Sequence, residues 1–371
     1  MEQRNSRKKI RYAVVGLGHI AQIAVLPAFK HARRNSELTA LVSGDAKKLE
    51  VLAKKYRIRH AASYNQYDDL LRSGEIDAVY IALPNSLHAE YSIRAANVGI
   101  HVLCEKPMAV TAKECAAMIR AACKHHIKLM IAYRLHFEEA NLQAIDIVKS
   151  GKIGEPRFFN SLFSLQVKEG NIRTRHDLGG GTLYDLGIYC INAARYLFQA
   201  EPQEAFAYSS RNGERRFREI DEMTSALLRF PDDRLATFTS SFGAMDAASY
   251  EIVGTKGRLR VDPAYEYAMA LWHYLTVGDK TTTRTFRKRD QFAPELLYFS
   301  DCIIKNREPE PSGSDGLSDV RVIEALYRSA ASRKPVKLAV KAPKKRPTLK
   351  QEIRRPPVGQ AKLIHAESAS E

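Results

Sequence analysis

In the first 136 residues, short apolar runs alternate with longer stretches whose apolar residues recur at helical spacing. The strand-like runs are RYAVVGLG (11–18), ELTALVSG (37–44), IDAVYIALP (76–84), HVLCEKP (101–107) and KLMIAYRLH (128–136). The helical stretches are HIAQIAVLPAFKHARR (19–34), DAKKLEVLAKKY (45–56), SLHAEYSIRAANVG (86–99) and AKECAAMIRAACKHH (112–126). Apolar strands that alternate with helices are buried on both faces, so the pattern predicts a doubly wound parallel sheet, an α/β fold.

From about residue 155 the pattern changes to strands of roughly six to ten residues with few helices between them. They are EPRFFNSLFSL (155–165), EAFAYSSR (204–211), MTSALLRF (223–230), RLATFTSSF (234–242), SYEIVGTKGRLRVD (249–262), YAMALWHYLTV (267–277) and TTTRTFR (281–287). Two helical stretches follow, at 293–306 and 317–333. This half predicts an α+β unit with a large, mostly antiparallel, open-faced sheet, whose free face could form a homodimer or homotetramer.

The net charge of +16 is concentrated at the two ends of the chain. Residues 1–11 hold five basic side chains and one acidic, and residues 341–371 hold eight basic and three acidic. More than half of the excess therefore lies outside the probable folded body, which argues against a nucleic-acid partner. Residues 339–371 are rich in Pro, Lys and Arg, so we expect an extended tail that is disordered or laid along a partner subunit.

Composition indicates a water-soluble protein, with 45% apolar and 27% charged residues. No window approaches the roughly 18 apolar residues that cross a bilayer, so no membrane contact is expected. The N-terminus lacks the apolar segment of a signal peptide, which predicts a cytoplasmic protein. The cysteines have no metal-ligand spacing, so we expect free, buried thiols and no metal site: Cys104, Cys115, Cys123, Cys190 and Cys302.

The first predicted strand ends in Gly16-Leu17-Gly18-His19-Ile20-Ala21, a G-x-G-x-x-A sequence that opens the first predicted helix. In this strand-to-helix context it is the fingerprint of a dinucleotide site. Gly16 permits the tight turn, and Gly18 lets the backbone approach a pyrophosphate that faces the helix N-terminus. We therefore expect Gly16, Gly18, His19 and Ile20 to bind the cofactor.

The end of the second predicted strand indicates which cofactor is preferred. An NAD site usually has Asp or Glu there to bind the ribose 2′-hydroxyl. This chain has Ser43 and Gly44 before Asp45, with Lys47 and Lys48 just beyond. A small hydroxyl and lysines suit a 2′-phosphate, so Ser43 and Lys48 favour NADP, while Asp45 leaves NAD as the alternative.

Three glycines lead into LGGGTLYDLGIYC (178–190), where Asp185 and Tyr189 are four residues apart and share one face of a helix. Taken alone, this is a Gly-rich turn before an amphipathic helix with a solvated polar face. A catalytic interpretation needs further support.

That support comes from four segments that together resemble the Gfo/Idh/MocA family, the relatives of glucose–fructose oxidoreductase and inositol dehydrogenase. They are CEKPMAV (104–110), LPNSLHAEYSIRAANVGIHVLCEKPM (83–108), AYRLHFEEAN (132–141) and GGGTLYDLGIYCINAARYL (179–197). The resemblance covers residues 10 to 338. It is greatest to the glucose–fructose oxidoreductase branch, because Tyr189 stands where inositol dehydrogenases carry His.

The resemblance implies a sugar oxidoreductase with Lys106, Asp185 and Tyr189 as catalytic and substrate-binding residues. Lys106 follows the carboxyl end of a strand, where open α/β sheets bind ligands. A partly desolvated lysine near a positive nicotinamide would have a lowered pKa suited to proton exchange. Lys-Pro also permits a cis bond that aims this side chain into the cleft. The glycines at 179–181 would let the chain pass close to the cofactor.

Further residues follow from the same comparison. Leu83, Asn85 and His88 should lie near the nicotinamide ribose with Glu105 beside them, although His88 could simply be a helix-end residue bonded to backbone. The resemblance puts Arg134 at the cofactor or substrate edge, and we expect Tyr64 to lie near the adenine. One departure affects substrate choice: several relatives carry Trp-Arg before the glycines, whereas this chain offers Arg173 and Arg175 as substrate contacts.

We therefore expect a basic arm (1–10), a dinucleotide-binding Rossmann domain (11–134), a substrate and dimerisation domain (135–338) whose last helices pack back on the first, and a basic Pro-rich tail (339–371). The expected reaction is hydride transfer between NADP and C1 of an aldose or related pyranose. Alternatives are an enzyme that retains its cofactor and passes the hydride to a second sugar, an inositol-type ring dehydrogenase, and a dinucleotide-sensing regulator. The short N-terminus, without a long clamping arm, weakens the first of these alternatives.

Overall fold

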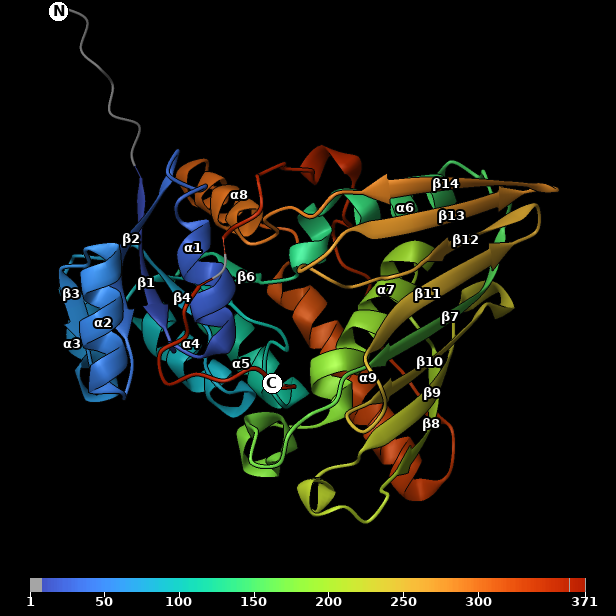
Figure 1. Cartoon of the computed structure of the whole chain (residues 1–371), viewed down its shortest axis with the longest axis horizontal. Helices are drawn as coiled ribbons and strands as arrows, with labels where there is room; N and C mark the ends of the chain where they lie inside the picture. The colour runs from blue at the N-terminus through green and yellow to red at the C-terminus, as the bar shows by residue number, and fades with distance from the viewer. Residues whose placement is uncertain (1–8, 360, 371) are drawn as a thin grey trace, which may run out of the picture.

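A computed structural model describes residues 9–359 and 361–370, and it contains two sheets that lie side by side (Figure 1). The predicted basic arm, 1–10, falls almost entirely outside the described residues. No helix within the described ranges is long and apolar enough to cross a membrane. Of the free cysteines there, Cys123 is exposed and the others are buried.

The N-terminal sheet has six parallel strands in the order β3-β2-β1-β4-β5-β6. They are β1 (Ile10–Val15), β2 (Ser36–Val42), β3 (His60–Ala62), β4 (Ala78–Ile81), β5 (His101–Cys104) and β6 (Leu129–Ile131). The flanking helices are a π-helical turn (Ala21–Val25) that continues into α1 (Leu26–Ala28), α2 (Ala46–Tyr56), α3 (Tyr67–Arg72), α4 (His88–Asn97) and α5 (Ala112–Lys124). The predicted doubly wound sheet is confirmed. Its strand order reverses between β1 and β4, which is where such sheets bind ligands.

The second sheet has nine strands in the order β14-β13-β12-β11-β7-β10-β9-β8-β15. They are β7 (Pro156–Ser164), β8 (Glu204–Ser210), β9 (Met223–Arg229), β10 (Leu235–Ser241), β11 (Ala247–Gly254), β12 (Gly257–Val261), β13 (Leu271–Val277), β14 (Lys280–Phe286) and β15 (Val336–Lys337). Every pairing is antiparallel except that of β7 with β10, so the predicted mostly antiparallel sheet is confirmed. The stretch 249–262, predicted as one strand, forms parts of β11 and β12, because the chain turns at Thr255 and Lys256.

Helices cover one face of this sheet and leave the other open. Besides α6 (Glu139–Lys149), the second half contains α7 (Ile188–Phe198), α8 (Ala293–Ile304) and α9 (Gly313–Ser332). α7 and α9 share an apolar core with the sheet, whereas α8 packs on the first sheet, where Tyr12 Oη lies 2.8 Å from Ser300 Oγ. Because residues alternate in a strand, the opposite face of the second sheet exposes apolar side chains, including Phe158, Leu162, Leu227, Leu235 and Tyr274.

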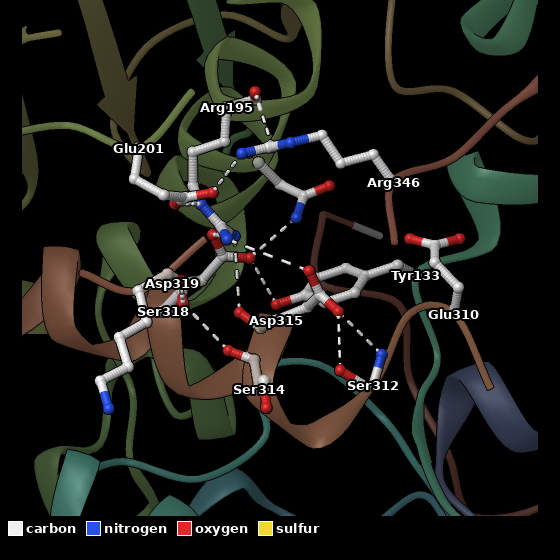
Figure 2. A network of polar contacts seen from close by, with 12 residues as sticks. Tyr133, Arg195, Glu201, Glu310, Ser312, Ser314, Asp315, Ser318, Asp319 and Arg346 are labelled. Carbon is white, nitrogen blue, oxygen red and sulfur yellow. Dashed lines mark hydrogen bonds and ion pairs between the residues drawn. The ribbon is translucent and has the colours of Figure 1, made fainter. Parts of the chain in front are cut away.

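The C-terminal tail is extended, as expected, but it lies along its own chain (Figure 1). Arg346 donates hydrogen bonds to the carbonyl of Arg195 at 3.1 Å and to Glu201 at 2.8 Å. Arg195 also binds Glu201 and Asp319, and it is nearly completely buried with them (Figure 2). With Asp315 4.0 Å from Arg195, three buried carboxylates surround one guanidinium, so a second cation from the tail is favourable there.

Candidate active site

A cleft of about 1050 Å³ lies between the two sheets. At one end its wall is the Gly-rich turn after β1, and at the other it is the π-helical turn Leu183–Gly187 that leads into α7. Single π-helical turns of this kind often occur at functional sites.

The Gly-rich turn has the geometry that the fingerprint requires. Gly16 has φ +92°, and a Cβ there would meet the carbonyl oxygen of Ala82 at 2.4 Å, so a side chain is excluded. At Gly18, by contrast, a Cβ would meet no atom within 4 Å, which leaves its backbone open to the cleft. His19 and Ile20 line the same end. The residues present therefore fit a dinucleotide whose pyrophosphate lies against this turn.

Ser43, directly after β2, and Lys48, in the first turn of α2, line the cleft, but Asp45 does not. Asp45 instead caps α2, where one oxygen accepts hydrogen bonds from the backbone amides of Lys47 at 2.9 Å and Lys48 at 3.0 Å. Its other oxygen lies 2.9 Å from Nδ1 of His365. A carboxylate engaged in this way is not turned toward a ribose, which favours the NADP interpretation.

Lys106 follows β5, and the Lys106–Pro107 bond is cis, as predicted. Its Nζ donates hydrogen bonds to the backbone carbonyl and the Oδ1 atom of Asp185, both at 3.0 Å. The same ammonium lies 4.8 Å from the ring centre of Tyr189. The predicted catalytic residues are therefore brought together.

Arg173 completes the contacts of Asp185, because its Nε donates to Oδ2 at 2.6 Å. Burial alone would raise the pKa of Asp185, but the charges of Arg173 and Lys106 outweigh burial and hold that pKa well below its usual range. Asp185 is therefore ionised at all ordinary pH values.

The sequence predicted a lowered pKa for Lys106, and the structure contradicts this. Burial does lower the pKa of Lys106, but the negative charge of Asp185 outweighs it and leaves the pKa raised. The ammonium form is therefore the resting form.

Arg134 contacts both the hydroxyl and the ring of Tyr189. Its guanidinium is buried and donates hydrogen bonds to the Tyr189 hydroxyl at 3.3 Å, to the side chain of Gln291 and to the carbonyl of Tyr265. Its Cζ atom lies 5.2 Å from the centre of the Tyr189 ring. The phenol thus lies against two cations, which follow the neighbouring strands β5 and β6 of the parallel sheet.

His88 lines the cleft with both ring nitrogens near backbone carbonyls, those of Pro107 at 2.7 Å and Leu83 at 2.9 Å. It therefore ties the loop after β4 to the loop that carries Lys106. Glu105 accepts from the Tyr80 hydroxyl at 2.8 Å. Leu83, Asn85, Glu105 and Tyr64 also line the cleft, as the sequence predicted.

Gly180 lines the cleft, and the protein itself also requires a glycine there, because a Cβ would meet the carbonyl oxygen of Arg173 at 2.3 Å. One prediction about this loop needs correction. Arg175 is the predicted site residue that the structure does not bring to the cleft. It is half exposed and pairs with Asp177 at 2.5 Å.

Sequence reasoning missed two parts of the wall. One is the loop after β12, where Glu266, Tyr267 and Tyr265 line the cleft. Its signal was an aromatic and acidic cluster, DPAYEYAM, directly after a strand. The other is the tail, whose residues Ser368, Ala369 and Ser370 also line the cleft. Nothing in their composition indicates a binding role.

Among the described residues, no group of three or more His, Cys, Asp or Glu side chains could hold a metal ion.

Comparisons with known proteins agree with this geometry. Residues 10–133 match the family model of the Gfo/Idh/MocA oxidoreductases with an NAD-binding Rossmann fold, and residues 141–260 match the model of a C-terminal domain of the same family. D-xylose 1-dehydrogenase [NADP(+)] of Haloarcula marismortui is 33% identical over 91% of this chain and 95% of its own.

Solved structures are similar over the same extent. Aldose-aldose oxidoreductase from Caulobacter crescentus, complexed with glycerol, superposes with a TM-score of 0.85 at 38% identity, covering 89% of this chain and 100% of its own. A 3-ketoreductase from Actinomadura kijaniata in complex with NADP and TDP-benzene gives a TM-score of 0.80 at 27% identity, over 87% of this chain and 98% of its own. With both family models matched and relatives aligned along nearly their whole length, the chain belongs to the Gfo/Idh/MocA family of oxidoreductases.

Proposed function

We propose that this chain is an NADP-dependent oxidoreductase that transfers a hydride between the nicotinamide and C1 of an aldose or a related pyranose. The main support for the proposal is that Lys106 and Arg173 each donate a hydrogen bond to one carboxylate oxygen of Asp185. All three residues lie in the cleft that Gly16 also lines. The names of two relatives, a xylose dehydrogenase and an aldose-aldose oxidoreductase, support an aldose as the substrate.

The cofactor would lie against Gly16, Gly18, His19 and Ile20, with Ser43 and Lys48 at its 2′-phosphate. When bound, it supplies the acceptor or donor of the hydride. The chain's own residues hold the sugar and manage the proton. Hydroxyls of the sugar would bind the lone pairs of Asp185 that Lys106 and Arg173 leave free.

Lys106 is the proposed proton-exchanging group. An ammonium has three hydrogens, of which two are bonded to Asp185, so one remains for the reacting oxygen. In the reducing direction, Lys106 donates its proton to the carbonyl oxygen. In the oxidising direction, the neutral amine accepts the hydroxyl proton, while Tyr189 gives the same oxygen a hydrogen bond.

A direct test is to denature the purified protein, assay the supernatant for NADP(H) and NAD(H), and then follow cofactor reduction with D-xylose and D-glucose. Lys106→Met should lower kcat by a factor of about 10² to 10⁴ and still bind NADP. Full activity in this variant would contradict the role of Lys106. A wild-type protein that binds NADP and oxidises no aldose would contradict the substrate class.

A second candidate, favoured by the 38% identity to an aldose-aldose oxidoreductase, is an enzyme that keeps its cofactor and passes the hydride to a second sugar. Release of a stoichiometric amount of NADP(H) on denaturation would support it.

We also propose a cytoplasmic homodimer or homotetramer joined through the exposed apolar face of the second sheet. Size-exclusion chromatography with light scattering can test the oligomeric state.

A further inference from the structure

We infer that residues 364–370 of the tail form a strap across the dinucleotide site and hold the cofactor on the enzyme between turnovers. The inference rests on the proposed function and extends it, since it concerns how long the cofactor stays. It follows from where the two ends of this segment are attached.

One end of the strap is attached beside the Gly-rich turn. Gln22, which is buried, donates from Nε2 to the carbonyl oxygens of Leu17 at 2.9 Å and Ile364 at 2.8 Å. Its Oε1 accepts from the backbone amide of Ile364 at 2.8 Å. Both backbone groups of Ile364 are thus bonded to the helix whose first turn would face the pyrophosphate. The next residue, His365, contacts Asp45 at the N-terminus of α2.

The other end is attached to the opposite wall. The carbonyl oxygen of Ala369 accepts a hydrogen bond from the backbone amide of Lys168 at 3.0 Å. The Ala369 side chain is buried in a small apolar cluster with Val167 and Leu186, and Leu186 is the neighbour of Asp185. The strap therefore joins the dinucleotide wall to the wall that carries the candidate catalytic residues.

The strap therefore passes along the cleft, which Ser368, Ala369 and Ser370 line together with Gly18 and Lys48. A dinucleotide below the strap can leave only after one attachment opens. Opening the Ala369 end exposes its buried side chain and breaks the bond from Lys168, and opening the Ile364 end breaks both bonds to Gln22. We therefore expect either opening to be slow relative to loss from an open cleft.

The earlier part of the tail is held separately, by Arg346 and by Gln351, which donates to Glu310. A chain that stops after Pro357 keeps both contacts. A second variant, Ala369→Glu, places a charge in the apolar cluster and should detach only that end. Glu367→Ala, at an exposed position of the same segment, is the matched control.

The experiment measures the dissociation rate of NADPH by stopped-flow fluorescence, with excess NADP added to trap the vacated site. Truncation after Pro357 and Ala369→Glu should each raise the rate at least about tenfold, while Glu367→Ala leaves it unchanged. Unchanged rates in the first two variants would overturn the strap and leave the proposed function intact. Tighter NADPH binding after truncation would also overturn it, because the tail would then compete with the cofactor. A full chain that binds neither dinucleotide would overturn the proposed function and the strap together.

Discussion

At the scale of single residues, the charge on Lys106 should set the pH dependence of sugar oxidation. Its pKa is raised in spite of burial, because Asp185 is bonded to it, so the neutral amine forms only at high pH. Asp185→Asn removes that negative charge and should lower the pKa of Lys106. The rising limb of kcat/KM against pH, measured in the oxidising direction, should therefore move to lower pH.

The matched control is Asp177→Asn, which makes the same chemical change at an exposed pair with Arg175 outside the cleft. Its pH profile should coincide with that of the unmodified enzyme. If Asp185→Asn lowers the rate at every pH without moving the limb, then Lys106 is not the group that takes the proton.

Lys48 provides a second residue-scale prediction, on cofactor choice. Lys48 lines the cleft beside Ser43, whereas Asp45, the carboxylate closest in sequence to the end of β2, is engaged as a helix cap. Lys48→Ala should weaken NADP binding about tenfold, a typical loss for one charge-assisted contact, and leave NAD binding unchanged. Lys47→Ala is the control, because the Lys47 ammonium is exposed and pairs with Glu50. Equal losses for NADP and NAD in Lys48→Ala would argue against a 2′-phosphate contact.

At the scale of elements, the parts that the sequence predicted are those that depend on local rules. The Gly16 turn follows from backbone sterics, and the shared face of Asp185 and Tyr189 follows from helical spacing. Their association with Lys106 was implied by the family resemblance. The choice between Arg173 and Arg175 could not be predicted this way. Which of them turns inward depends on how residues 173–175 pack against Gly180, where a Cβ would meet the carbonyl oxygens of both arginines. This contact between loop segments leaves no periodic pattern.

That contact leads to a prediction about the loop. Gly180→Ala would place a Cβ 2.3 Å from the Arg173 carbonyl oxygen, so the segment carrying Arg173 must move. Moving it weakens the bond from Arg173 to Asp185, and we expect a loss of about 1–3 kcal/mol in the free energy of unfolding together with a lower kcat/KM. Gly359→Ala, where a Cβ would meet nothing within 4 Å, should change neither. Unaltered kinetics for Gly180→Ala would show that the loop tolerates a side chain.

At the scale of the whole molecule, the path of the tail could not be predicted, because its partners are far away in sequence. Arg346 finds Glu201, which is 145 residues away, and Gln22 binds Ile364, which is 342 residues away. Composition correctly indicated an extended, basic segment. Where that segment lies depends on buried carboxylates that only the folded chain brings together (Figure 2).

The buried carboxylates predict how stability responds to losing their cation. Arg195→Met leaves Glu201, Asp315 and Asp319 buried with no guanidinium among them except that of Arg346. Removing one partner of such a cluster costs about 3–5 kcal/mol. Burial raises the pKa of Asp315 and of Asp319, and Arg195 opposes this rise, so the variant should raise both further.

A carboxyl group whose pKa is higher in the folded than in the unfolded state loses stability as pH rises through the unfolded and then the folded value. Arg195→Met should therefore be more destabilised at pH 8 than at pH 5, as measured by urea unfolding at the two pH values. Arg346→Met is the comparison variant, because it removes the other, more exposed cation of this cluster. It should destabilise the protein less than Arg195→Met does, and its effect should depend less on pH. An equal loss at both pH values for Arg195→Met would mean that packing of the side chain, not its charge, holds α7 against α9.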